Sequence, residues 1–179
     1  EFLGVPNTPL IYWALDDEVA ALSKGPHLDD LVQAREGLTT GSNDIFLRRW
    51  FEVSIGRVGF GIKSNEEAEA AGYRWFPYQK GGSSRRWYGN FDFVVDWEDD
   101  GARARQNTDP KTGRVRSHNY NGAFAFRKGF TWSGISGDGF AVRHIEGGFM
   151  FDAKGPMAFA HRDEDLPVIE GFLNSSTAT

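Results

Sequence analysis

The sequence predicts an α+β fold, in which a strand-rich, twisted sheet core carries a few short helices. Three observations support this class. Apolar and polar residues alternate with a period of two in several segments, which is typical of strands. Signals for the start and end of helices are few. Finally, 22 glycines and 7 prolines punctuate the 179 residues and separate the apolar segments as turn residues do.

We expect a single domain over residues 1–179, with an acidic lead-in (1–36), a strand-rich body (37–162), and a C-terminal helix with a polar tail (163–179). A chain of this length buries about two-thirds of its unfolded surface, so it needs no disulfide. It contains no Cys, which excludes disulfides and thiolate metal sites. The chain starts at Glu1 without an initiator Met, so we expect a fragment of a longer protein. Neither a membrane segment nor an export signal is visible, which fits the cytoplasm.

Two helices are predicted in the first half of the chain. The first follows Asp16-Asp17-Glu18, because acidic side chains favour a helix N-terminus, and it ends before a Gly-Pro pair. The second covers Glu66–Ala71, where Ser64 and Glu67 have the spacing of a capping box. Gly72 then suits the left-handed conformation that often ends a helix.

A third helix is predicted near the C-terminus. It begins at Asp163 or Asp165, carries Pro167 in its first turn, and frays into Ser175-Ser176-Thr177. Its apolar face is expected to hold Val168, Ile169, Phe172 and Leu173.

Strands are predicted between these helices. Residues Phe91–Trp97 alternate strictly, which predicts one aromatic face and one mostly acidic face, and Phe51–Ile55 alternate in the same way. Further strands are expected at Ala123–Phe126, Phe140–Ile145 and Phe149–Phe151, with glycine turns at 137–139 and 147–148. Residues Asn107–Gly113 have the composition of an exposed hairpin tip.

Charge is distributed unevenly along the chain. The total is 20 basic and 25 acidic side chains, a net charge of −5. Residues 41–91 nevertheless hold eight basic and five acidic side chains, and residues 101–128 hold seven and one. An acidic segment at 92–100 separates the two blocks, and both ends of the chain are acidic. This pattern favours a basic face that the average charge hides.

No catalytic or metal-binding constellation is present. The four His residues are scattered and lack metal-ligand spacing. A nucleophile elbow and a phosphate-binding loop are absent, and Gly134–Gly139 has the wrong order for a dinucleotide fingerprint. Asp99-Asp100 and Asp163-Glu164-Asp165 are predicted to be a strand end and a helix start rather than cation sites.

The strongest compositional anomaly is the segment 73–91, which holds seven aromatic and four basic residues and no acid. Such interleaving suits a nucleic acid, because cations neutralise phosphates while rings stack on bases. The alternative is a set of core aromatics under a solvated loop. We expect Lys80, Arg85 and Arg86 to contact phosphates, and we expect core positions for Trp75, Phe76, Trp87 and Tyr88.

A second candidate segment lies upstream, at Gly37–Trp50. In one interpretation, Ser42 or Asp44 caps a short helix whose Phe46, Leu47 and Trp50 face the core. In the other, the free N–H groups at that helix start contact an anion or a base together with Thr39, Thr40 and Asn43. The sequence favours neither.

Together these segments resemble a known family. The resemblance is carried by Phe2 with Pro6–Trp13, Gly37–Arg48, Arg74–Gly82, Arg86–Asn90, Val95–Gly101, Gly129–Ser133 and Gly171–Ser175. These ordered motifs are similar to the region after the catalytic domain in adenine-specific DNA methyltransferases of the BREX phage-exclusion type (PglX-like), which are related to Type IIG and Type IIL restriction-modification enzymes.

The resemblance implies a target recognition domain, similar in role and fold to those of Type I specificity subunits. Its partners would be double-stranded DNA, the catalytic domain of the same parent chain and other defence-system proteins. The S-adenosylmethionine loop and the Asn-Pro-Pro-Tyr-like motif are absent here, so the methyl transfer and its cofactor, S-adenosylmethionine, would belong to the parent enzyme. This fragment itself would hold no cofactor and no metal.

Under this hypothesis, basic side chains contact phosphates and asparagines read bases in the major groove. The DNA-binding candidates are Thr39, Thr40, Ser42, Asn43, Arg48, Arg49, Lys80, Ser83, Ser84, Arg85, Arg86, Asn90, Asn107, Arg114, Arg116, Asn119 and Asn121.

Two alternatives stay open at this point. A glycan- or peptide-binding module also uses exposed aromatic rings on glycine-rich loops, but such binding is nearly insensitive to salt. The acidic ends of the chain are the third hypothesis, as docking surfaces for the methyltransferase domain or another defence protein.

Overall fold

We describe the protein from a computed structural model, in which the described residues are 17, 26–134 and 139–176. The chain divides into two compact units, Glu1–Leu31 and Val32–Thr179. Several predictions lie outside the described residues: most of the helix after Asp16, the motif residues Phe2 and Pro6–Trp13, the turn residues 137 and 138, and Thr177.

The first unit contains one described helix, α2 (Leu28–Leu31). The Asp30 carboxylate accepts a hydrogen bond of 2.9 Å from the His27 N–H, which satisfies a backbone donor at the start of this helix.

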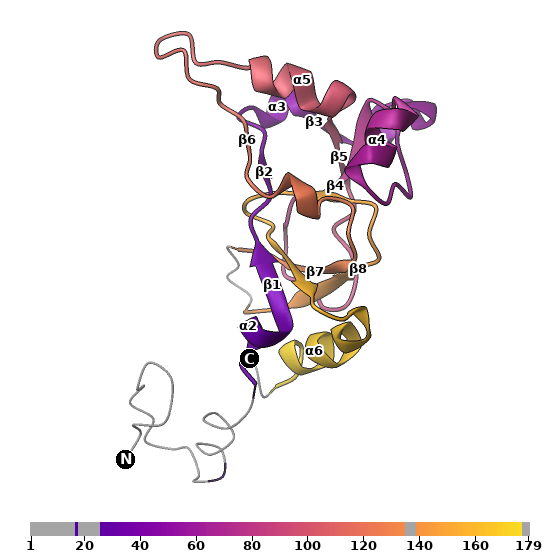
Figure 1. Ribbon diagram of the computed structural model, residues 1–179, viewed down its shortest axis with the longest axis vertical. Helices are drawn as coiled ribbons and strands as arrows, with labels where there is room; N and C mark the ends of the chain where they lie inside the picture. Colours follow the sequence, from indigo (N-terminus) through magenta and orange to yellow (C-terminus); the bar gives the residue numbers. More distant parts are fainter. Residues whose placement is uncertain (1–16, 18–25, 135–138, 177–179) are drawn as a thin grey trace. The chain divides into compact units, whose positions relative to one another are not determined.

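Two four-stranded sheets form the second unit (Figure 1). The first has the order β1-β10-β7-β8 and is antiparallel throughout, with β1 (Val32–Arg35), β10 (Met157–Ala160), β7 (Gly129–Trp132) and β8 (Val142–Ile145). The second has the order β3-β5-β4-β9, with β3 (Leu47–Arg49), β5 (Phe93–Asp96), β4 (Trp75–Gln79) and β9 (Met150–Phe151). Only its β4–β9 pair is parallel. A two-stranded ribbon pairs β2 (Leu38–Thr39) with β6 (His118–Asn119).

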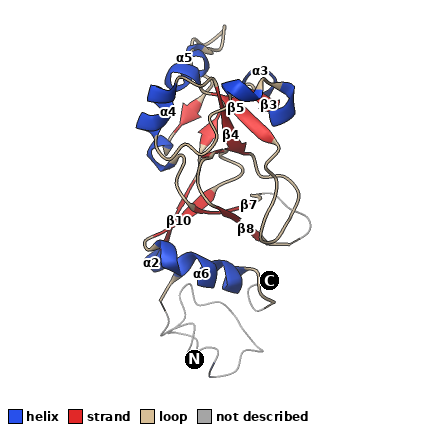
Figure 2. Cartoon of the chain, turned by 90° about the vertical axis from the view of Figure 1, so that its right-hand side faces the viewer, coloured by secondary structure: helices blue, strands red, loops and turns tan. Residues whose placement is uncertain are grey.

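Short helices surround these sheets (Figure 2). Near the β3-β5-β4-β9 sheet are α3 (Asn43–Phe46), α4 (Asn65–Ala71) and α5 (Glu98–Gln106). Helix α6 (Leu166–Leu173) packs against β7 and β8 of the other sheet. The predicted α+β class is confirmed, since the sheets are open and the helices are few and short.

Helix α4 confirms the capping signals of the sequence. The Ser64 side chain accepts a hydrogen bond of 3.2 Å from the Glu67 N–H, and Gly72 ends the helix in the left-handed conformation with φ of 64°. The Glu67 carboxylate accepts from the N–H of Lys63, one residue before the expected partner.

Helix α6 begins at Leu166 with Pro167 in its first turn, as predicted, after a 3₁₀ turn at Asp163–Asp165. The predicted apolar face is partly wrong. Val168 and Phe172 are 74% and 57% exposed, whereas the buried residues are Leu166, Ile169, Glu170 and Leu173.

Three of the predicted strands are confirmed in shortened form, as β5, β8 and β9. Two are wrong. Residues 51–55 lie in and between 3₁₀ turns at Trp50–Glu52 and Ile55–Arg57. Residues 123 and 124 lie in the 3₁₀ turn Gly122–Phe124, and residues 125 and 126 follow it. The alternation failed there because Phe51 and Ile55 are exposed, so the two-residue period does not report a buried face.

Strand β5 also differs from its prediction, because both of its faces are covered. The Asp96 carboxylate is buried and pairs with Arg74 at 2.8 Å and with Arg103 of α5. Asp99 and Asp100 lie in the first turn of α5 rather than at a strand end, with left-handed backbone angles. The strand therefore ends at an ion-paired carboxylate rather than on an acidic surface.

The core joins the sheets through aromatic contacts. Phe76 of β4 packs edge-on against Phe126 with ring centroids 5.6 Å apart, and Phe151 of β9 packs against Phe159 of β10 at the same separation. The second contact connects the two sheets, so β9 is held by both.

None of the helices that the structure describes has the length and apolar character needed to cross a membrane.

Candidate nucleic-acid interface

Three segments run in parallel and end at the same edge of the second unit. Strand β4 pairs in parallel with β9, and Leu38 of β2 forms a parallel bridge with Asp152. The Asp152 N–H donates to the Gln79 carbonyl at 2.8 Å. Because the carboxyl ends of parallel segments meet at one edge, the residues that follow each segment come together there. These residues are Thr39, Thr40, Lys80, Ala153 and Lys154.

Asp152 organises this edge. Its Oδ2 lies 3.1 Å from the Tyr78 hydroxyl and 3.6 Å from Lys80 Nζ, and its Oδ1 accepts from the Lys154 N–H at 2.7 Å. The Tyr78 hydroxyl also lies 2.8 Å from the Leu38 carbonyl. Burial raises the pKa of Tyr78 well above its ordinary value of 10.0, and the Asp152 charge raises it further. The hydroxyl therefore stays protonated and acts as a donor at neutral pH.

A hollow of about 480 Å³ opens at this edge, and we call it the strand-end pocket. It is lined by Thr39, Thr40, Gly41, Ser42, Asn43, Lys80, Asp152, Ala153 and Lys154. A second hollow of about 390 Å³ shares Asn43 and Lys80 with it and adds Arg48 and Arg49. The structure thus brings two sequence segments, 39–49 and Lys80, into one continuous surface.

The turn at Ser42 agrees in part with the first interpretation, and the second, contact with an anion or a base, stays a prediction. Ser42 is the N-cap of α3, although its side chain makes no capping hydrogen bond. Phe46 and Leu47 are buried as expected, whereas Trp50 is exposed. The Thr40 hydroxyl donates to Asn43 Oδ1 at 2.7 Å, which leaves the Asn43 amide nitrogen available.

Close backbone approaches require glycine around the pocket. A Cβ on Gly155 would lie 2.5 Å from the Gly81 nitrogen, so the chain after Lys80 packs directly against the chain after Lys154. A Cβ on Gly41 would lie 2.6 Å from the backbone of Arg116. This second contact places the turn at 39–43 beside the base of the hairpin described next.

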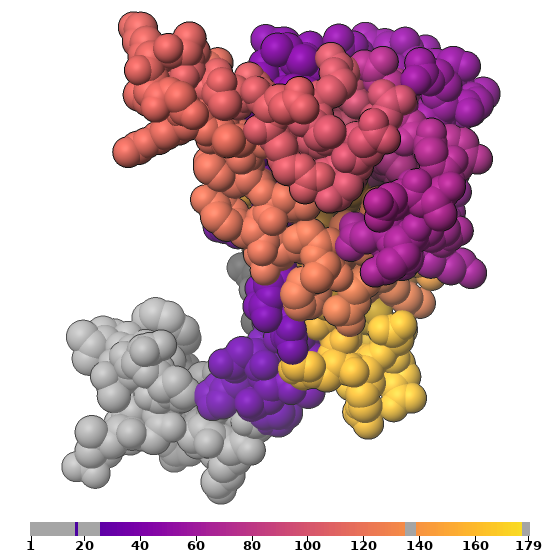
Figure 3. Space-filling view, turned by 45° about the horizontal axis from the view of Figure 1, so that its top comes forward, coloured from indigo at the N-terminus to yellow at the C-terminus, as the bar shows by residue number. Residues whose placement is uncertain are grey.

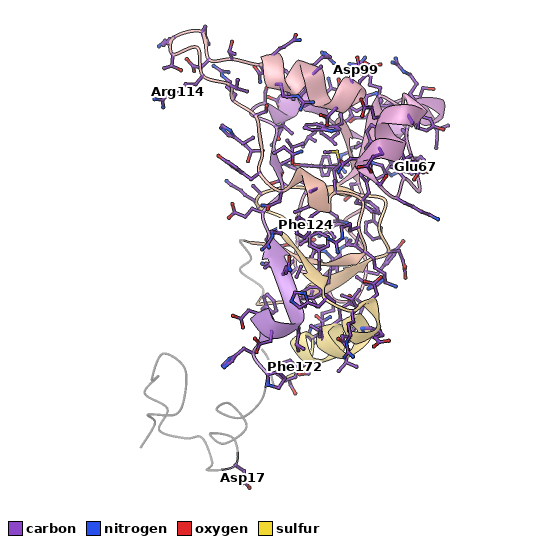
Figure 4. The ribbon with its side chains drawn as sticks, in the orientation of Figure 1. Asp17, Glu67, Asp99, Arg114, Phe124 and Phe172 are labelled. Atoms are coloured by element: carbon purple, nitrogen blue, oxygen red, sulfur yellow. The ribbon has the colours of Figure 1, made fainter. Side chains whose placement is uncertain are left out.

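The 107–119 hairpin projects from the second unit (Figures 1 and 3). Thr108 bridges Val115, and the Asp109 carboxylate accepts from the N–H groups of Lys111 and Thr112. These two hydrogen bonds hold the pKa of Asp109 below its ordinary value, and Arg116 at 3.1 Å adds to the effect. The predicted hairpin tip is confirmed, and Arg114 lies at its far end (Figure 4).

The 81–90 loop is a further candidate segment. It runs to the edge of the β1-β10-β7-β8 sheet. Trp87 bridges Arg143 of β8 in parallel, with its N–H 3.1 Å from the Val142 carbonyl. This loop carries Ser83, Ser84, Arg85, Arg86 and Asn90. These five predicted residues line neither of the two hollows. Arg85 lies instead near Arg143, whose pKa is lowered by burial and by the charge of Arg85.

The four predicted base-reading asparagines are placed differently. The amide nitrogens of Asn90 and Asn121 donate to the carbonyls of Ser83 and Glu36, so both are engaged within the chain. The Asn107 amide nitrogen is buried without a hydrogen-bond partner. Asn119 is exposed and pairs with Leu38 in the β2–β6 ribbon. In this state, Asn119 and Asn43 are the better placed of the asparagines to meet an outside ligand.

Among the described residues, cations in and around these segments pair with carboxylates less often than cations elsewhere. Within the described residues, no carboxylate pairs with Arg48, Arg49, Arg85, Arg86, Arg114 or Lys154. Lys80 and Arg116 have one acidic partner each. Elsewhere in the described part of the chain, six cations form ion pairs with carboxylates (Arg57, Arg74, Arg103, Arg105, Lys128 and Arg162), whereas Arg35, Lys63, Arg127 and Arg143 do not.

Sequence reasoning missed three features of this surface. Lys154 lines the strand-end pocket, and its signal is the glycine that follows it. Arg143 is fully buried and has no carboxylate partner in the described part of the chain; its Nη1 reaches only Ser133 Oγ at 3.4 Å. Trp87 and Tyr88 were expected in the core but are exposed.

A larger hollow, of about 610 Å³, lies between α4 and the start of α5 and has an acidic lining. Trp97 Nε1 donates to Asp100 Oδ1 at 3.2 Å there, which agrees with a structural role for this carboxylate pair. Glu67 and Asp99, labelled in Figure 4, mark the two helices. In the part of the chain that is described, no group of three His, Cys, Asp or Glu side chains is arranged to hold a metal ion.

Two known proteins are similar to the chain over nearly all of its length. The adenine-specific methyltransferase PglX of Lacticaseibacillus casei (strain Zhang) is 41% identical over 179 residues, which is 99% of this chain and 15% of that protein. The adenine-specific methyltransferase BrxX of Escherichia coli O9:H4 (strain HS) is 34% identical over 169 residues, which is 94% of this chain and 13% of that protein. No family model matches the sequence.

The chain spans about one seventh of the length of these relatives. The resemblance predicted from the motifs is confirmed at this level: the chain is a PglX-like segment, which corresponds to one part of the PglX and BrxX adenine-specific methyltransferases.

Proposed function

We propose that this chain is the target recognition segment of a longer adenine-specific DNA methyltransferase. Its surface binds double-stranded DNA, while a separate catalytic domain of the parent chain flips and methylates one adenine. S-adenosylmethionine binds in that catalytic domain and supplies the methyl group. The parent enzyme works in phage defence of the BREX or restriction-modification type, in the cytoplasm where its DNA is, and contacts other defence proteins there.

The observation that supports DNA binding best is the difference in ion pairing among the cations. Seven cations were selected from the sequence as phosphate contacts. Among the described residues, no carboxylate pairs with five of them (Arg48, Arg49, Arg85, Arg86 and Arg114), whereas Lys80 and Arg116 have one acidic partner each. A cation without an acidic partner keeps its full charge for a ligand, whereas a paired one must first break its ion pair. The positive charge of these five arginines is therefore available to an anionic ligand.

We infer three contact regions, each supported by the arrangement of its residues. The strand-end pocket presents Lys80 and Lys154 beside Thr39 and Ser42, and the adjoining hollow adds the two arginines of β3. The 107–119 hairpin projects from the unit, as a segment that enters a groove must. The 81–90 loop supplies the third region at the edge of the first sheet.

The test is the salt dependence of duplex binding by the full-length protein. Each phosphate contact adds about 0.9 to the slope of log K against log salt concentration. Arg85→Ala with Arg86→Ala is expected to weaken binding to all sequences and to lower that slope by up to about 1.8. The matched control is Arg57→Ala with Arg162→Ala, since both residues are exposed but ion-paired. An equal effect of the two double variants would contradict the proposal.

The main alternative, a glycan- or peptide-binding module, has one supporting observation, the exposed rings of Trp87 and Tyr88. It predicts binding to a neutral ligand that is nearly insensitive to salt. The same titration therefore separates the two functions.

A further inference from the structure

Two aromatic side chains of the 81–90 loop are turned to solvent. Trp87 is 55% exposed and Tyr88 is 71% exposed, whereas Trp75 and Phe76 of the same aromatic-rich segment are buried in β4. Within the described residues, the Trp87 indole makes no ring contact, and its Nε1 has no hydrogen-bond partner. Two consecutive residues thus each expose a ring on which a flat ligand can stack.

The backbone holds Trp87 in a conformation that is unfavourable for a large side chain. Its φ is 70°, in the left-handed region that such residues rarely adopt. Its N–H donates to Val142 at 3.1 Å, and its carbonyl accepts from the His144 N–H at 3.0 Å. The edge of β8 therefore fixes the strained residue, and residues held in this way are frequent at binding sites.

The Tyr88 ring is held in place by neighbouring aromatic side chains. Its ring meets Phe91 edge-on with centroids 4.5 Å apart, and Phe91 lies 5.1 Å from Phe149. One edge of the ring is thus anchored to partly buried aromatics, while the rest faces solvent. The Tyr88 ring therefore has little freedom to lose when a ligand binds.

The charge around the two rings identifies the class of ligand. Arg85 and Arg86 precede them directly, and no carboxylate of the described residues pairs with either. Arg143, fully buried beneath the loop, also lacks a carboxylate partner and leaves Nε and Nη2 without hydrogen bonds. These unpaired positive charges would not contribute to the binding of a neutral sugar. A nucleic acid offers phosphates that the arginines can contact and flat bases that can stack on the rings.

We propose that Trp87 and Tyr88 form a stacking element that inserts at a base-pair step of the bound DNA, while Arg85 and Arg86 hold the flanking phosphates. The proposal rests on the proposed function and adds a mechanism to it: DNA is unstacked locally at this loop. Inserted side chains of this kind kink the duplex and let it follow the protein surface.

The experiment uses the full-length protein and a duplex that carries its methylation site, mapped by sequencing modified adenines. The base analogue 2-aminopurine replaces one base at a time, and its fluorescence rises where stacking is lost. With the wild type we expect a rise at the flipped adenine and a second rise at another step. The second rise is expected to be lost in Trp87→Ala and recovered in Trp87→Phe, which keeps a ring, while the rise at the flipped adenine remains. Trp87→Ala is expected to bind about ten-fold more weakly with an unchanged salt slope.

Controls separate the outcomes. Trp50→Ala removes an exposed indole outside the 81–90 loop, at the 3₁₀ turn Trp50–Glu52, and is expected to leave the second rise intact. Tyr88→Ala repeats the test without touching the strained residue. Wild-type affinity and fluorescence in both Trp87→Ala and Tyr88→Ala would overturn the stacking element while DNA binding stands. Failure of the wild type to bind any duplex, or salt-insensitive binding of a neutral oligosaccharide, would overturn the proposed function and the stacking element together.

Discussion

Replacing Tyr78 with Phe tests how the strand-end pocket is held together. The substitution keeps the ring and removes only the hydroxyl, which lies 2.8 Å from the Leu38 carbonyl and 3.1 Å from Asp152 Oδ2. Both acceptors are buried and share the single proton of this hydroxyl, so the substitution removes a donor that water cannot readily replace. A hydrogen bond of this kind contributes about 1–3 kcal/mol, more when its acceptor is charged. We expect a loss of about 2 kcal/mol, which lowers the melting temperature by about 4–8 °C in a unit of this size.

Urea unfolding of the 179-residue chain, followed by tryptophan fluorescence, measures this loss. The control is Tyr120→Phe, because the Tyr120 side chain is exposed and its hydroxyl has no hydrogen-bond partner in the described part of the chain. We expect a change below about 0.5 kcal/mol in the control, as for most surface substitutions. A similarly small change in Tyr78→Phe would refute the conclusion that the hydroxyl joins the three parallel segments.

Two further predictions concern the helices of the second unit. Ser64→Ala removes the acceptor of the Glu67 N–H at the start of α4 and is expected to destabilise the unit by about 1 kcal/mol, measured by urea unfolding; an unchanged midpoint would contradict the capping role. Burial raises the pKa of Glu170 above its ordinary 4.5, so this group favours folding below that pH and its contribution is lost as the pH rises through the folded pKa. Glu170→Gln, which cannot ionise, is therefore expected to flatten the pH dependence of stability above pH 4.5, and an equally steep curve in the variant would contradict this assignment.

Local signals in the sequence identified some elements well. The capping box at Ser64 and the proline in the first turn of α6 act within a few residues, so they are readable without knowledge of the fold. Strand β4 was not predicted, because the sequence contains no local signal for it. All five of its residues are buried, so it has no alternation, and Pro77 argues against an internal strand. The structure tolerates this proline because β9 pairs with β4 only from Tyr78 onward.

The candidate site depended even more on long-range structure. The sequence identified Thr39, Asn43 and Lys80 as separate candidates, but it contains no sign that they share one pocket. Their meeting requires the parallel arrangement of β4, β9 and Leu38, which is a tertiary property. Aromatic residues posed a similar problem, because composition does not distinguish buried Trp75 from exposed Trp87 in the same segment.

The most direct test of the account exchanges this segment between two related methyltransferases, such as the PglX and BrxX proteins that match it at 41% and 34% identity. Each chimera carries the catalytic part of one protein and the segment equivalent to residues 1–179 of the other. Sequencing of modified adenines in cells then gives the methylated site of each chimera. The account predicts that the site follows the exchanged segment. A methylated site that follows the rest of the chain would contradict the claim that this segment recognises the target.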